Sequence, residues 1–120
     1  MTKIEYCNSI RGFYFSAKGH AEYAESGKDI VCAGISAYTS AILIACEKAA
    51  NKGLIRNWRH KEENGEIEIC FRYTKLGFLP ETIELLIECL QEIEIQNPAH
   101  LQITKLSEAE IAEKEYSFKI

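Results

Sequence analysis

The sequence predicts an α+β fold with the element order ββαββαβ, in which a mixed or mostly antiparallel sheet packs with two helices. Five short stretches alternate apolar and polar residues, which is typical of half-buried strands. Two longer stretches are rich in apolar residues at helical spacing. The chain has 120 residues, which is enough for one domain, and we place that domain at residues 1–107.

The elements follow from these patterns in chain order. The predicted strands cover residues 3–7, 13–18, 54–62, 66–73 and 101–103. Asn64-Gly65 lies between the third and fourth strands and favours a two-residue hairpin turn. The first helix is expected from Ile30 to Lys52, closed by Gly53, and Pro80 suits the first turn of the second helix.

The residues after the last predicted strand show little apolar periodicity. Residues 108–120 are interpreted as a charged C-terminal tail with no clear role, and we expect this tail to be dispensable for activity.

Charge and apolar patterning exclude several classes of protein. Fourteen basic and 18 acidic residues give a net charge of −4, and the basic residues are scattered, so direct binding to nucleic acid is disfavoured. The longest strongly apolar stretch, residues 41–46, is short for a membrane span, and residues 1–20 show no secretory signal pattern. The sequence therefore predicts no membrane partner and a cytoplasmic location.

The five cysteines form no closely spaced pair, so neither a disulfide framework nor a zinc site is expected. Most of them read as small buried hydrophobic residues. Cys32 differs because Asp29 is a candidate N-cap, which places the thiol in the first turn of the predicted helix. Helix N-termini favour the thiolate form of cysteine, and their free N–H groups can hold an oxyanion.

The predicted first helix has one polar stripe on an otherwise apolar surface. At about 100° per residue, the stripe contains Cys32, Ser36, Thr39, Ser40 and Glu47. Ser36 can bind a substrate backbone group from this position. Gly34 is costly inside a helix, and a close approach by another backbone would explain it.

A long loop, residues 19–29, separates His20 from Cys32. If the loop folds back, the two side chains form a Cys–His pair, the arrangement of a thiol protease or acyl transferase. Asp29 then either orients the imidazole or only caps the helix. Residues 21–28 are expected to form a mobile lid, with Tyr23 packed over apolar substrate residues. From spacing alone, an ordinary packed cysteine and an ordinary loop histidine remain the alternatives.

The stretch GHAEYAESGKDIVCAGIS resembles the ribosomal-processing cysteine proteases of the Prp family, whose signature is a Gly-His-Ala start, a Gly-x-Asp-Ile-Val-Cys-Ala run and a later Ser. The resemblance implies that Cys32 is the nucleophile and His20 the general base, with Asp29 and Ser36 supporting the site. It also implies a homodimer that needs no metal or cofactor.

The implied substrate is the N-terminal extension of a large-subunit ribosomal protein, number twenty-seven, cut after an aromatic pair. The alternative is a non-catalytic ribosome-assembly factor with the same fold. A binding factor needs neither Cys32 nor His20. A thiol redox role is a third reading, although no resolving cysteine lies near Cys32 in the sequence.

Overall fold

The computed structural model describes residues 1–19 and 30–118 of the chain. Eight elements follow one another in these residues: β1 (Thr2–Asn8), β2 (Gly12–Lys18), α1 (Ile30–Asn51), β3 (Ile55–Glu63), β4 (Glu66–Tyr73), α2 (Leu79–Gln96), β5 (Leu101–Lys105) and α3 (Ala109–Phe118). The predicted α+β class and the order ββαββαβ are confirmed, and one further helix is added at the end.

The five strands form a single mixed sheet in the order β3-β4-β2-β1-β5. The β1–β2, β2–β4 and β3–β4 pairs are antiparallel, whereas β1 and β5 are parallel, with Thr2 opposite Leu101. The Asn64-Gly65 turn lies in the β3–β4 hairpin as predicted, and both residues have the positive φ angles (53° and 76°) that such a turn requires.

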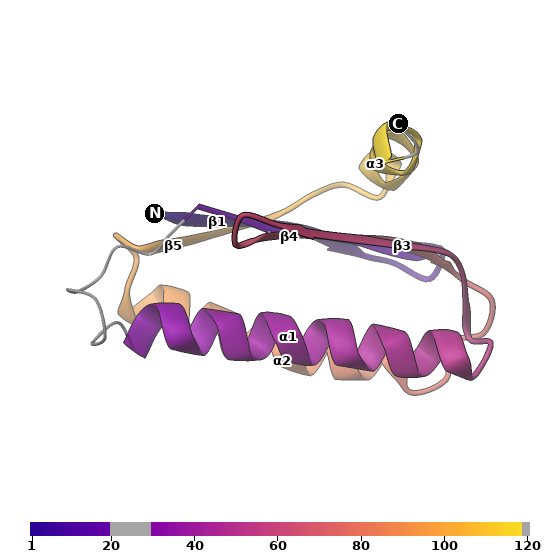
Figure 1. Cartoon of the computed structure of the whole chain (residues 1–120), viewed down its shortest axis with the longest axis horizontal. Helices are drawn as coiled ribbons and strands as arrows, with labels where there is room; N and C mark the ends of the chain where they lie inside the picture. The colour runs from indigo at the N-terminus through magenta and orange to yellow at the C-terminus, as the bar shows by residue number, and fades with distance from the viewer. Residues whose placement is uncertain (20–29, 119–120) are drawn as a thin grey trace.

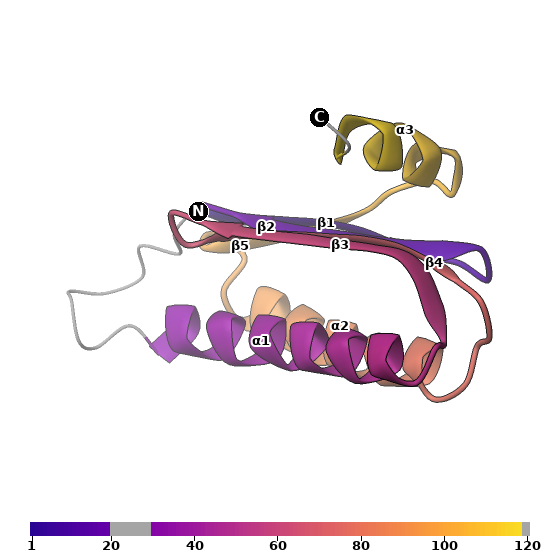
Figure 2. The same cartoon turned by 45° about the vertical axis from the view of Figure 1, so that its right-hand side comes forward.

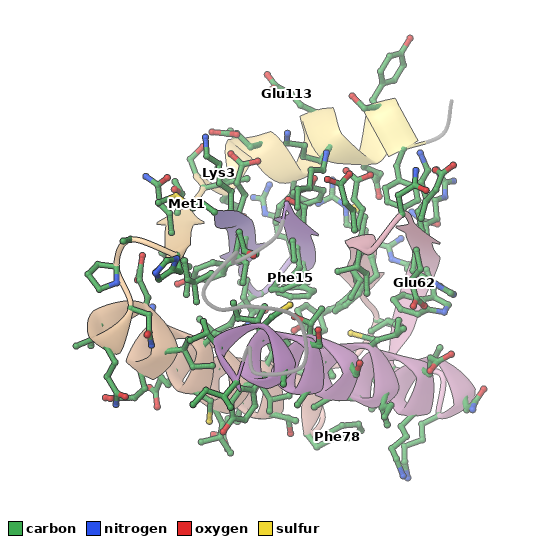
Figure 3. All side chains as sticks on the ribbon, turned by 60° about the vertical axis from the view of Figure 1, so that its left-hand side comes forward. Met1, Lys3, Phe15, Glu62, Phe78 and Glu113 are labelled. Atoms are coloured by element: carbon green, nitrogen blue, oxygen red, sulfur yellow. The ribbon has the colours of Figure 1, made fainter. Side chains whose placement is uncertain are left out.

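Both long helices lie on one face of the sheet (Figure 1). The strands send alternate side chains into the space between the layers, so Phe13, Phe15 and Phe71 are fully buried there. Figure 3 shows Phe15 between the sheet and α1. The centroids of the Phe13 and Phe71 rings lie 5.4 Å apart, so the two rings pack directly against each other in the core.

Helix α1 is long and apolar enough to cross a membrane, by length and composition alone. In this fold it lies against the sheet and α2 instead, with Val31, Ile35, Ile42 and Cys46 among its buried residues. The apolar composition of α1 is therefore explained by its packing in the core, since a surface helix would need only one apolar face.

The sequence prediction left residues 108–120 as a charged tail, and the structure adds a third helix there. Residues 109–118 form α3, which lies on the face of the sheet opposite α1 and α2 (Figure 2). Ile111 of α3 is 1% exposed and packs with Cys7, Tyr14 and Cys70 on that face. Apolar periodicity failed to reveal α3 because a single fully buried side chain holds an otherwise charged helix.

Candidate active site

Cys32 is the third residue of α1, in its first turn, and its side chain is partly buried. It borders a groove of about 480 Å³, together with Ser36, Thr39 and Ser40 from the same helix. The polar stripe predicted from helical spacing is thus confirmed over its first half. Thr39 departs from the rest of the stripe, because it is only 8% exposed and its Oγ1 has no hydrogen-bond partner in the described residues.

The opposite wall of the groove is the β3–β4 hairpin. It contributes residues 62–67, including the turn Asn64-Gly65. Glu62 is exposed and pairs across the strands with Ile67, whose side chain is buried against the core. Figure 3 labels Glu62 beside the strands, at about the height of Phe15 and above α1. With Glu63 and Glu66, it gives this wall three carboxylates, so the groove favours positively charged groups over negatively charged ones.

This acidic wall was not predicted as part of the site. The local sequence Glu62-Glu63-Asn64-Gly65-Glu66 contained a signal, because two acidic residues precede a hairpin turn and one follows it. The missing information was tertiary, since sequence alone does not say that the hairpin lies opposite the start of α1.

The end of β2 forms the third border of the groove, through Ala17 and Gly19. Gly19 has a φ of 89°, and a Cβ atom there would lie 2.5 Å from the Met1 carbonyl oxygen, so a side chain is excluded. The Gly19 N–H donates a hydrogen bond of 3.3 Å to the Glu66 carboxylate. The backbone is therefore held at the residue that precedes His20 in the sequence.

Three residues of the predicted site lie outside the described residues. These are His20, Tyr23 and Asp29. The pairing of His20 with Cys32, the capping by Asp29 and the lid at 21–28 therefore stay predictions.

Gly34 faces away from the groove and lies against α2. A Cβ atom at this position would lie 3.1 Å from Cδ1 of Ile93, a side-chain atom of α2. Gly34 and Ile93 border a separate hollow of about 410 Å³ on the helix side of the molecule. The expectation of a close backbone approach is corrected, because the neighbour is the end of a side chain, brought near by helix packing.

Three of the other four cysteines, Cys7, Cys46 and Cys70, are poor nucleophiles in this fold because they are buried. Burial raises the pKa of the Cys46 thiol to about 12 and that of Cys70 to about 11, and it also raises the pKa of Cys7. Cys89 is partly buried and borders the hollow beside Gly34. Cys32 therefore combines access to the groove with a helix N-terminus.

Within residues 1–19 and 30–118, no group of three or more His, Cys, Asp or Glu side chains is arranged to hold a metal ion. The chemistry that the described site offers is that of a thiol in the first turn of a helix, at the border of a groove of about 480 Å³. A thiol at a helix N-terminus beside a groove is a kind of site that thiol-dependent acyl-transfer enzymes use, the cysteine proteases among them.

The chain belongs to the cysteine protease Prp family, whose model matches residues 1–102. The match ends before α3 begins. Among curated proteins, no significant match is found.

Solved structures show the same fold. The crystal structure of the essential ribosomal processing protease Prp from S. aureus with a covalently linked product peptide has a TM-score of 0.73 and 22% identity, covering 88% of this chain and 100% of that chain. The structure of the same protease with a substrate peptide has a TM-score of 0.64 and 19% identity, again covering 88% of this chain and 100% of that chain. SMU.848 from Streptococcus mutans gives 0.61 and 17%, covering 88% of this chain and 94% of its own.

Proposed function

We propose that this protein is a cysteine endopeptidase that removes the N-terminal extension of a large-subunit ribosomal protein, number twenty-seven. The observation that carries the proposal is the position of Cys32 in the first turn of α1, where it borders a groove of about 480 Å³, in a chain of the Prp family. The S. aureus protease, described as a ribosomal processing protease and solved with two peptides, supports the choice of substrate class.

The proposed reaction starts with transfer of the Cys32 thiol proton to the imidazole of His20. The sulfur then attacks the scissile carbonyl carbon, and the oxyanion is stabilised by free N–H groups in the first turn of α1. Collapse of this intermediate breaks the C–N bond, and the His20 imidazolium gives its proton to the leaving amine. Water, deprotonated by His20, hydrolyses the thioester and releases the new carboxylate.

The remaining site residues have supporting roles in this proposal. Ser36 is exposed in the groove one turn after Cys32, so its hydroxyl is placed to bind a backbone group of the peptide. Asp29 caps α1 or orients His20, and Tyr23 packs on apolar substrate residues. We further propose that the enzyme is a cytoplasmic homodimer that requires no metal.

The test is incubation with a peptide that carries the host's own ribosomal-protein extension, read by mass spectrometry. We expect one cut, none with Cys32→Ala, and a rate at least ~100-fold lower with His20→Ala. Cys89→Ala is the matched control, because Cys89 is the other partly buried cysteine among the five, and it should cleave normally.

Cleavage by Cys32→Ala at the normal rate would contradict the proposed nucleophile. Tight binding of the intact peptide by wild-type protein, with no cut, would instead support the non-catalytic assembly factor.

A further inference from the structure

The edge strand β3 depends on α3 as well as on its neighbour β4. β3 lies at one end of the sheet and pairs with β4 alone. Its pairing is interrupted by a β-bulge between Arg56 and Arg59, where Asn57 has a φ of 55°. Asparagine adopts this left-handed region more readily than other non-glycine residues do, so Asn57 suits the bulge, and its side chain is free to bond outside the strand.

Glu115 of α3 supplies the partner for that bond. Its two carboxylate oxygens accept hydrogen bonds from Nε and Nη2 of Arg72 on β4, at 3.2 and 3.3 Å. The two side chains are 21% and 20% exposed, so this bidentate pair is shielded from water. Asn57 Nδ2 donates to the same carboxylate at 3.4 Å, which ties the bulge to the ion pair.

A second contact lies further along β3. The ammonium nitrogen of Lys61 is 4.8 Å from the centroid of the Phe118 ring, at the end of α3. Lys61 immediately precedes Glu62, the first residue of the hairpin that borders the groove. α3 therefore contacts β3 at the bulge and again next to the groove wall.

A bulge redirects the strand that follows it. The course of β3 after Asn57 affects Glu62 and Glu63 at its end, whereas Glu66 and Ile67 belong to β4, which is also paired with β2; all four residues border the groove with Cys32. Because the family match ends at residue 102, this support is an addition to the part of the fold that the family model describes.

We propose that α3 is a clasp that fixes the β3–β4 hairpin opposite Cys32, and that Glu115 is a positioning residue for peptide binding. The role in peptide binding rests on the function proposed above. The clasp acts from the face of the sheet opposite α1, the helix that carries Cys32, so it influences the groove without touching substrate (Figure 2).

The experiment compares Glu115→Gln with Glu113→Gln, a matched variant two residues away on the exposed side of α3 (Figure 3). The first measurement is hydrogen exchange of the amides of residues 57–67. Glu115→Gln should speed their exchange at least about tenfold, with little change in β1 and β2, because loss of the ion pair frees the edge strand first. Glu113→Gln should leave exchange unchanged.

The second measurement is peptide cleavage. Glu115→Gln should raise KM about three- to tenfold and leave kcat within about twofold, since only binding geometry is disturbed. Lys61→Gln removes the other contact between β3 and α3, so it should also raise KM. If it does, a folding defect specific to position 115 does not explain the effect of Glu115→Gln.

Two results would overturn the clasp. One is uniform acceleration of exchange across all five strands with an unchanged KM, which is the result of a merely stabilising helix. The other is unchanged exchange in residues 57–67. If the wild-type protein cleaves no peptide, the proposed function fails, but the exchange comparison still decides whether α3 holds the hairpin.

Discussion

Replacing Gly34 by alanine separates two explanations for a glycine inside α1. Glycine in a helix interior costs about 1 kcal/mol relative to alanine. In the described residues, apart from the helix backbone and its chain neighbours, Cδ1 of Ile93 is the one atom within 4 Å of the added Cβ, at 3.1 Å. That distance is tight, but the atom is the far end of a flexible side chain.

The sign of the effect depends on whether Ile93 can move. Its side chain borders a hollow of about 410 Å³, so Cδ1 has space to turn away from the new methyl group. Moving a side chain off its preferred rotamer costs of order 0.5–1.5 kcal/mol, and a shift of a few tenths of an ångström costs less. We therefore expect Gly34→Ala to raise the free energy of unfolding by up to about 1 kcal/mol, or roughly 4 °C in Tm.

The assay is thermal and denaturant unfolding of a double-mutant cycle. Ile93→Val removes the contacting atom, so in that background Gly34→Ala should show the full gain of about 1 kcal/mol. Ala37, which is exposed and lies in the next turn of α1, provides the reverse control. Ala37→Gly should lower the free energy of unfolding by about 1 kcal/mol, the difference in helix propensity between the two residues.

A loss of stability on Gly34→Ala in both backgrounds would refute the reasoning, because it would show that something other than Ile93 occupies this space. Peptide cleavage gives an independent readout. Gly34 faces α2, so cleavage should persist, whereas a stable variant that no longer cleaves would favour the earlier hypothesis of a close approach by another backbone.

Two further predictions concern the thiols. Iodoacetamide at pH 7.5 should label Cys32 and Cys89 in the native protein and spare Cys46, because Cys46 is fully buried and its pKa is raised. Peptide mapping identifies the labelled residues. Rapid labelling of Cys46 in the native protein would contradict the packing. Alkali should destabilise the fold through the same residue. Burial raises the pKa of Cys46 from 9.0 to about 12, so the folded protein keeps the neutral thiol where the unfolded chain already loses its proton. The contribution of this thiol to the free energy of unfolding is therefore complete below pH 9. It is lost as pH rises toward 12, by about 1.4 kcal/mol per pH unit. Urea unfolding of Cys46→Ala between pH 8 and about 10.5 should show a correspondingly shallower decline, and an identical slope would refute the assignment.

The strands and the two long helices were predictable because each has a regular apolar period of its own. Asn64-Gly65 also fixed the hairpin locally, through the φ angles that its turn requires. The bulge at Asn57 was not predictable, since the side chain that holds it belongs to α3. α3 itself escaped notice because Ile111 is its one fully buried residue and its ion pair joins Glu115 to Arg72, two charged residues that read as solvent-exposed in a local pattern.

The sequence predicted the wall of the groove that α1 forms, but not the wall that the β3–β4 hairpin forms. Helical spacing placed Cys32 and Ser36 on one stripe, and both border the groove. The opposing carboxylates depend on how the β3–β4 hairpin lies over α1, which is a property of tertiary packing. Gly34 was misinterpreted for the same reason, because its neighbour Ile93 comes from a distant part of the sequence.

The parallel pairing of β1 with β5 has a consequence for biosynthesis. Thr2 pairs with Leu101, so β1 leaves the ribosome long before its partner does. Until β5 emerges, β1 can pair with β2 but presents an open backbone edge on its other side, where another nascent chain can bind. Contacts so distant along the chain form slowly. We therefore expect co-translational folding to stop at a partly assembled sheet that chaperones must shield, and to finish only when β5 has been synthesised.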